Sequence, residues 1–182
     1  MFDIRKIQEN VMYEAVKAES DAEAAREVVD GAERLGRAET NPDWVKAAVR
    51  RLENKFDPAA ITRIRRNCQC GYGMDEKLAL LKELISASTN IEELASLEKA
   101  KAAGLFCKDD ELFLQFDRCP CPMLAEVDHL ETDTWCQCTT GYSKVLFEKA
   151  FACEVDVELL KSIKMGDPVC LMKITLHHPR WQ

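Results

Sequence analysis

The sequence predicts an α+β protein, in which a helical N-terminal half precedes a small antiparallel sheet with a packed helix. Residues 1–105 repeat apolar side chains at the spacing of amphipathic helices. Residues 106–182 contain runs in which apolar and polar side chains alternate, as they do in half-buried strands. We therefore expect a helical region over 1–105 and an α+β domain over 106–182, together forming one compact unit.

Capping residues mark the helix starts of the N-terminal half. The segment Ser-Asp-Ala-Glu at 20–23 has the spacing of a capping box, whose first and last side chains satisfy free amides at a helix start. Asn41 and Asp57 each precede a proline and predict helices over about 42–56 and 58–66. The buried stripe expected of the first of these two helices consists of Trp44, Val45, Ala48, Val49 and Leu52.

Two further helices are expected after a glycine-containing break at 68–73. The first covers about Asp75 to Ser86, and the second runs from about Ile91 to Ala103. Gly104 is expected to end the second helix, because glycine readily adopts the left-handed conformation that follows a helix.

The pattern changes to alternation after residue 105. Residues 112–116 have the period of a strand, and Lys108-Asp109-Asp110 predicts a turn before them. Residues 154–176 predict an antiparallel hairpin with its turn at 165–168. Leu160 interrupts the alternation, which predicts a β-bulge at that position.

Three segments are expected between these strands. Residues 125–134 are acidic and have no period, which is typical of a loop. Residues 135–138 are expected to form a short strand or another extended segment. Residues 142–152 are apolar on most sides and predict a buried helix.

Composition and charge indicate which classes of partner and which cellular compartment to expect. The net charge of −7 argues against nucleic acid, and the basic run from Lys46 to Arg66 is expected to form a solvated helix face, with a phosphate site as the alternative. Charges throughout Met1–Asn10 predict no signal peptide. No apolar run reaches the roughly 20 residues that a membrane span needs. We therefore expect a cytoplasmic protein with no membrane partner, whose nine cysteines are free thiols or metal ligands.

Three Cys-x-Cys pairs are the strongest chemical signal of the sequence. Side chains at i and i+2 of an extended segment point to the same face, so each such pair would present two thiols together. Six converging thiolates would repel one another unless they bound a metal, stayed protonated in apolar surroundings or formed disulfides. The six candidate metal ligands are Cys68, Cys70, Cys119, Cys121, Cys136 and Cys138.

Zinc is the cofactor that these pairs favour. Zinc takes four ligands and accepts sulfur readily, so two pairs complete one site and leave one pair over. The usual spacings of iron–sulfur ligands are absent. Two alternatives remain, namely cysteines that act as small buried hydrophobes and thiols that act in redox or nucleophilic chemistry.

Position along the chain divides the cysteines into candidate catalytic residues and residues expected in the core. Cys70 and Cys138 each lie near an expected helix start, where the helix dipole lowers a thiol pKa, so they are the candidate catalytic residues of the alternative hypothesis. His129, in the acidic loop, could reach a metal or a thiol. The cysteines expected in the core are Cys107, Cys153 and Cys170.

The C-terminal half carries an ordered set of motifs: Trp135-Cys136-x-Cys138-x-x-Gly141-Tyr142, Phe147-Glu148, Val155-x-Val157-Glu158-Leu159-Leu160-x-Ser162-Ile163 and Gly166-Asp167-x-x-Cys170-x-x-x-Ile174. Over about 107–176 they resemble the bacterial aminothiazoline-carboxylate hydrolase-like family and the related four-vinyl-reductase-like domains. The resemblance implies an α+β domain enclosing a small-molecule pocket, often in a homodimer. It also implies conserved thiols at Cys136, Cys138 and Cys170, a glycine turn at Gly141, and metal binding by cysteines and histidines. Ile163 stands where the vinyl-reductase-like group leads us to expect another cysteine.

Three functional hypotheses follow from the sequence. The first is a cytosolic domain that binds or senses an unknown small molecule and whose thiolates hold zinc. The second is a cysteine-dependent hydrolase or thiol redox enzyme. The third is an interaction protein whose cysteines are structural.

Overall fold

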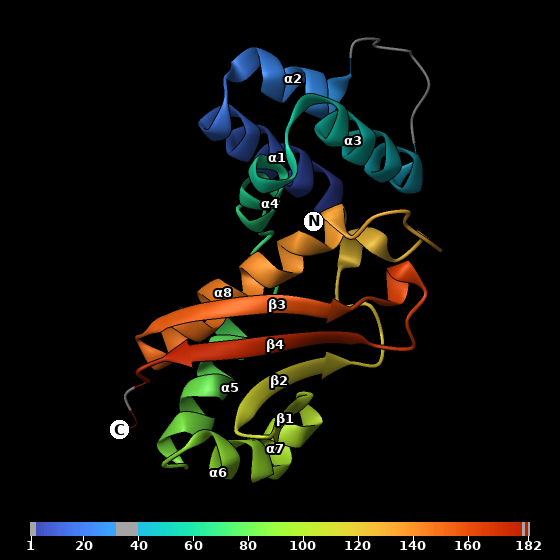
Figure 1. Cartoon of the computed structure of the whole chain (residues 1–182). Helices are drawn as coiled ribbons and strands as arrows, with labels where there is room; N and C mark the ends of the chain where they lie inside the picture. Colours follow the sequence, from blue (N-terminus) through green and yellow to red (C-terminus); the bar gives the residue numbers. More distant parts are fainter. Residues whose placement is uncertain (1–2, 32–39, 180, 182) are drawn as a thin grey trace. The chain divides into compact units, whose positions relative to one another are not determined.

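The computed structural model describes residues 3–31, 40–179 and 181, and it confirms the predicted α+β class (Figure 1). Contacts group the chain into two compact units, here called the helical unit and the sheet unit. The helical unit comprises residues up to 70, 119–141 and 164–166, and the sheet unit comprises 71–118, 142–163 and 167–182. The expected division into a helical region over 1–105 and an α+β domain over 106–182, together one compact unit, stays a prediction.

Four helices and three short segments form the helical unit. The helices are α1 (Ile4–Glu19), α2 (Ala22–Asp30), α3 (Asn41–Lys55) and α4 (Pro58–Arg66). The short segments are the single turns η1 (Pro122–Leu124) and η2 (Thr134–Cys136), and the first residues of α8 (Gln137–Phe151), up to 141. Helix α1 packs against α2 and α4, and η2 contacts both α3 and α4.

Two of the three predicted helix caps are wrong by one residue. Asp21, not Ser20, caps α2, since its carboxylate accepts the Ala24 N–H at 2.8 Å. Thr40, not Asn41, caps α3. In both places two good capping residues are adjacent, so local preference does not choose between them. Asp57 caps α4, as predicted.

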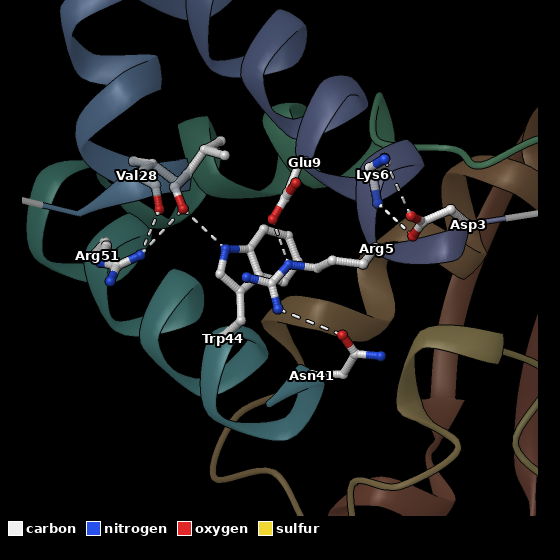
Figure 2. Close-up of polar contacts among 9 residues, drawn as sticks. Asp3, Arg5, Lys6, Glu9, Val28, Asn41, Trp44 and Arg51 are labelled. Atoms are coloured by element: carbon white, nitrogen blue, oxygen red, sulfur yellow. Dashed lines mark hydrogen bonds and ion pairs between the residues drawn. The ribbon is translucent and has the colours of Figure 1, made fainter. Parts of the chain in front are cut away.

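The core of the helical unit is organised by Trp44, and the whole predicted stripe of α3 is buried. The indole N–H of Trp44 donates to the carbonyl of Val29 at 2.9 Å, and the Arg5 guanidinium lies 4.3 Å from the ring centroid. Figure 2 shows this arrangement, with Arg51 donating to the carbonyl of Val28. The ring of Trp135 meets Trp44 edge to face at 5.5 Å.

The sheet unit contains four antiparallel strands in the order β1-β2-β4-β3 (Figure 1). The strands are β1 (Leu105–Lys108), β2 (Glu111–Phe116), β3 (Glu154–Lys161) and β4 (Cys170–His177). The predicted turn joins β1 to β2 through Asp109 and Asp110, both with positive φ, and the predicted bulge lies between Leu159 and Lys161. Strand β1 escaped prediction because four residues are too few to establish alternation.

Helices cover one face of this sheet. They are α5 (Met74–Ser86), α6 (Ile91–Ser96), α7 (Glu98–Ala102) and the part of α8 from 142 onwards. The predicted helix 91–103 is interrupted at Leu97, whose ψ of 138° is extended. Gly104 follows with a φ of +85°, as predicted. Among the helices of the described chain, none is long and apolar enough to cross a membrane.

The segment 135–138 is helical, which corrects the predicted extended conformation. Residues up to Cys136 form η2, and α8 begins at Gln137, five residues before the predicted helix start. The turn is closed by the Cys136 N–H, which donates to the carbonyl of Asp133 at 2.8 Å. The side-chain amide of Gln137 donates to the Asp133 carboxylate at 2.9 Å. The first bond gives backbone groups of the turn the partners that an isolated extended segment lacks, and the second adds a side-chain bond to the same turn.

Gly141 allows the start of α8 to approach the end of α4. A Cβ atom at Gly141 would lie 2.0 Å from the carbonyl oxygen of Arg66, closer than any side chain tolerates. The close approach brings the Cys138 turn against the segment that follows α4.

We predict that Gly141→Ala destabilises the protein by about 1–3 kcal/mol, because the added methyl group displaces backbone rather than a flexible side chain. Thr139→Ala, in the same turn, is the control and should leave the free energy of unfolding nearly unchanged. Urea denaturation of both variants tests this. Equal stability of Gly141→Ala and the wild type would contradict the close approach.

Candidate functional site

All six paired cysteines lie in the helical unit. Cys68, Cys136 and Cys138 are buried, and Cys70, Cys119 and Cys121 are half-buried. None of the six forms a disulfide. The three pairs, which are up to 70 residues apart in the sequence, therefore share one unit of the fold.

Cys68 and Cys138 connect the first pair to the third. The Cys138 thiol donates to the backbone carbonyl of Cys68, with 2.9 Å between sulfur and oxygen. The Cys68 thiol donates in turn to the carbonyl of Ile64 at 3.2 Å. Both sulfurs thus act as neutral S–H donors, which agrees with burial raising the pKa of each thiol.

Cys138 is the electrostatic centre of the group. Burial raises the pKa of its thiol to about 12, Arg65 lowers it, and the neighbouring Cys121, Cys68 and Cys70 raise it further. Cysteines from all three pairs therefore influence the Cys138 thiol. The raised pKa of Cys138 is opposite to the lowered pKa that a helix dipole alone would produce, because the effect of burial is larger.

Cys121 stands at the start of η1 among groups that favour a thiolate. Burial raises the pKa of its thiol, but the backbone amides of Met123 and Leu124, the indole of Trp135 and the Arg65 guanidinium all lower it. Amides that approach a cysteine sulfur stabilise its ionised form. The groups around the Cys121 sulfur therefore favour its thiolate form, although burial still raises the pKa of the thiol.

Arg65 is the residue that sequence reasoning missed. It was expected on a solvated face, yet its exposed fraction is 0%. Its Nη2 donates to the carbonyl of Trp135 at 3.0 Å, and its guanidinium lies 4.2 Å from the centroid of the Trp135 ring. Arg65 also lowers the pKa of the Cys68 thiol against the effect of burial. A signal was present, because Ile61, Ile64, Arg65 and Cys68 have the i, i+3, i+4, i+7 spacing of a buried helix face.

The remaining predicted cysteines lie in both units. Cys119 is half-buried and Cys136 is buried in the helical unit. Cys170 is buried, and Cys107 and Cys153 pack partly buried against the core of the sheet unit, in agreement with their predicted structural role. As the side chains stand, no three His, Cys, Asp or Glu residues within 3–31, 40–179 and 181 are spaced to hold a metal ion.

His129 lies at a surface pocket of the helical unit, away from the contacts described for the thiols. The pocket has a volume of about 290 Å³. Its lining residues are Lys46, Val49, Arg50, Glu53, His129, Leu130, Glu131 and Thr132. Glu53 is already engaged, since it accepts hydrogen bonds from the hydroxyl groups of Thr132 and Thr134 at 2.7 and 2.9 Å.

We predict that Cys138 of the metal-free protein reacts very slowly with iodoacetamide at pH 8. A pKa of about 12 leaves roughly a thousand-fold less thiolate than an ordinary cysteine has at that pH, and the thiolate is the reacting form. Peptide mass spectrometry measures the rate, and the same residue in urea-unfolded protein is the control. Rapid labelling of folded Cys138 would favour the nucleophile hypothesis.

Comparison with known proteins adds a family assignment. No curated protein and no solved structure matches the chain. The resemblance to aminothiazoline-carboxylate hydrolase-like and four-vinyl-reductase-like proteins therefore stays a prediction. The family model that matches, DUF6144, covers residues 1–181. The chain thus belongs to a family of unknown function, DUF6144.

Proposed function

We propose that the helical unit is a thiolate metal site, in which Cys68, Cys70, Cys121 and Cys138 hold one zinc ion. Two observations support the proposal: the Cys138 thiol donates to the backbone carbonyl of Cys68, and Cys121, Cys68 and Cys70, from all three Cys-x-Cys pairs, each raise the pKa of the Cys138 thiol. Four sulfurs complete the tetrahedral shell that zinc prefers. The protein would then be a metal-dependent binding or sensing protein of the cytoplasm.

In the described arrangement two of the four proposed ligands act as protonated thiols. Cys68 and Cys138 both use their S–H groups to bond backbone carbonyls. Binding zinc requires these protons to leave and the side chains to turn towards a common point. A change between staggered χ1 rotamers moves a cysteine sulfur by about 3 Å without moving the backbone.

The backbone supports such a site at each of its three segments. Cys68 and Cys70 follow the end of α4, Cys121 heads the η1 turn, and Cys138 lies in the first turn of α8. The amides of Met123 and Leu124 approach the Cys121 sulfur and stabilise its ionised form. The ligands are therefore attached to short, defined elements and not to a long loop.

The chemistry of this ligand set favours a structural or sensing role over hydrolysis. Catalytic zinc sites keep one coordination position for water or substrate, whereas four protein sulfurs close the shell. Burial also raises the pKa of the Cys138 thiol, so a free nucleophilic thiolate at that residue is disfavoured. Metal would join three chain segments, and its binding free energy would add to the free energy of unfolding.

We predict one zinc ion per chain in protein purified without added metal, measured by elemental analysis. Single Cys→Ser changes at positions 68, 70, 121 and 138 should each reduce the bound zinc and lower the melting temperature, because an oxygen ligand replaces a favoured sulfur. A strong chelator should lower the melting temperature of the wild type and leave that of the variants nearly unchanged.

Matched cysteine variants test the ligand set. Cys153→Ser changes a half-buried cysteine of the sheet unit and should keep full zinc content. Cys119→Ser and Cys136→Ser should also retain zinc, since these residues lie outside the proposed four. Protein that contains no zinc in any preparation contradicts the proposal, and two ions per chain contradict the four-ligand set.

A further inference from the structure

The pocket between α3 and residues 129–132 lies wholly within the helical unit. Its volume of about 290 Å³ is near the lower end of the range of small-molecule sites, so it suits a compact ligand. Val49 and Leu130 line it with apolar side chains that are only 8% and 3% exposed, and charged side chains complete the lining. The pocket shares no residue with the proposed metal site, so its ligand can be tested independently of zinc.

Hydrogen bonds hold the wall opposite α3 in place. The Leu130 N–H donates to the carbonyl of Lys164 at 2.8 Å. The hydroxyl groups of Thr132 and Thr134 both donate to Oε1 of Glu53 on α3, at 2.7 and 2.9 Å. This wall is therefore tied both to α3 and to a distant segment of the same unit, and the pocket is formed before a ligand enters, as small-molecule sites usually are.

Lys46 and Arg50 differ from the other cations of the basic run. They lie one turn apart on the face of α3 that lines the pocket. Within the described part of the chain, no ion pair joins either of them to a carboxylate, and Arg50 donates from Nε to the backbone carbonyl of Lys46 at 3.4 Å. By contrast, Lys55 and Arg63 are each paired with a glutamate. The pocket thus has two exposed cations on one wall that can receive an anionic group.

The two carboxylates of the pocket are in different situations. Glu53 already accepts hydrogen bonds from two threonine hydroxyl groups. Glu131 lies on the opposite wall, is exposed, and has no ion pair among the residues that the structure describes. A simple anion would meet repulsion from both carboxylates, whereas a ligand with one positive and one negative group would match the two walls.

We propose that this pocket binds a small zwitterion of the α-amino-acid class with an aliphatic side chain. The ligand carboxylate faces Lys46 and Arg50, its ammonium group faces Glu131, and its side chain covers Val49 and Leu130. Charge-assisted hydrogen bonds at both ends fix the orientation of the ligand. Burial of the aliphatic side chain adds to the affinity.

Isothermal titration calorimetry of the full chain with leucine and with its two half-ligands tests the proposal. The compound 4-methylpentanoate is leucine without the amino group, and 3-methylbutylamine is leucine without the carboxylate. Leucine should bind with a dissociation constant of about 1 mM or below, and each half-ligand should bind about three- to tenfold more weakly. Inorganic phosphate is the probe for a purely anionic site.

Charge-removing variants assign each end of the ligand. Arg50→Gln should weaken leucine binding about three- to tenfold and leave that of 3-methylbutylamine unchanged. Glu131→Gln should weaken leucine binding similarly and leave that of 4-methylpentanoate unchanged. Lys55→Gln, on the same helix, and Glu126→Gln, in the segment before the pocket wall, are the matched controls and should bind leucine as the wild type does. Far-UV circular dichroism checks that each variant is folded.

Three results would overturn the assignment. The first is no leucine binding up to about 10 mM, and the second is a half-ligand that binds as tightly as leucine. The third is phosphate binding that exceeds leucine binding and is lost in Arg50→Gln, which would show a purely anionic site. Equal losses of leucine binding in the pocket variants and the controls would also contradict the proposal. None of these results concerns zinc content, so the pocket and the metal site stand or fail separately.

Discussion

The helical unit is built around two indole rings that meet edge to face, each with an arginine over its face. Arg5 lies over Trp44, Trp44 meets Trp135, and Arg65 lies over Trp135. Both indoles and Arg65 are buried. This series of contacts joins α1, α3 and α4 to η2, which lies about 70 residues further along the chain than Arg65. The electron-rich face of an indole attracts a cation, which an aliphatic side chain in the place of either ring could not do.

Arg65 also influences the electrostatics of the thiols, although burial has the larger effect. Trp135 precedes Cys136 in the sequence, and its carbonyl and ring hold the Arg65 guanidinium beside the sulfurs. Burial raises the pKa of the Cys138, Cys68 and Cys121 thiols, and Arg65 opposes that effect at all three. Protonated thiols leave the cation unbalanced, whereas thiolates without a second cation would repel one another. A divalent ion at the proposed site would relieve both difficulties together by replacing the thiol protons.

Much of the fold was predictable, because it depends on local preferences. The proline-led starts of α3 and α4, the buried stripe around Trp44 and the bulge near Leu160 are all encoded in short stretches of sequence. Two errors arose where the apolar pattern does not decide the conformation. The helical conformation of 135–138 depends on hydrogen bonds to Asp133. The break at Leu97 divides a segment whose apolar period is continuous.

The sequence by itself determined the class of fold, most helix positions and the presence of three cysteine pairs. It could not determine which sulfurs meet, because the argument from i and i+2 assumed extended segments, and Cys138 lies in a helix. Nor could it distinguish Arg65 from its solvated neighbours, since a charged residue is normally exposed and burial depends on contacts from distant segments. Tertiary structure alone decided that this one arginine faces the thiols, because the Trp135 ring and carbonyl that hold it come from 70 residues further along the chain.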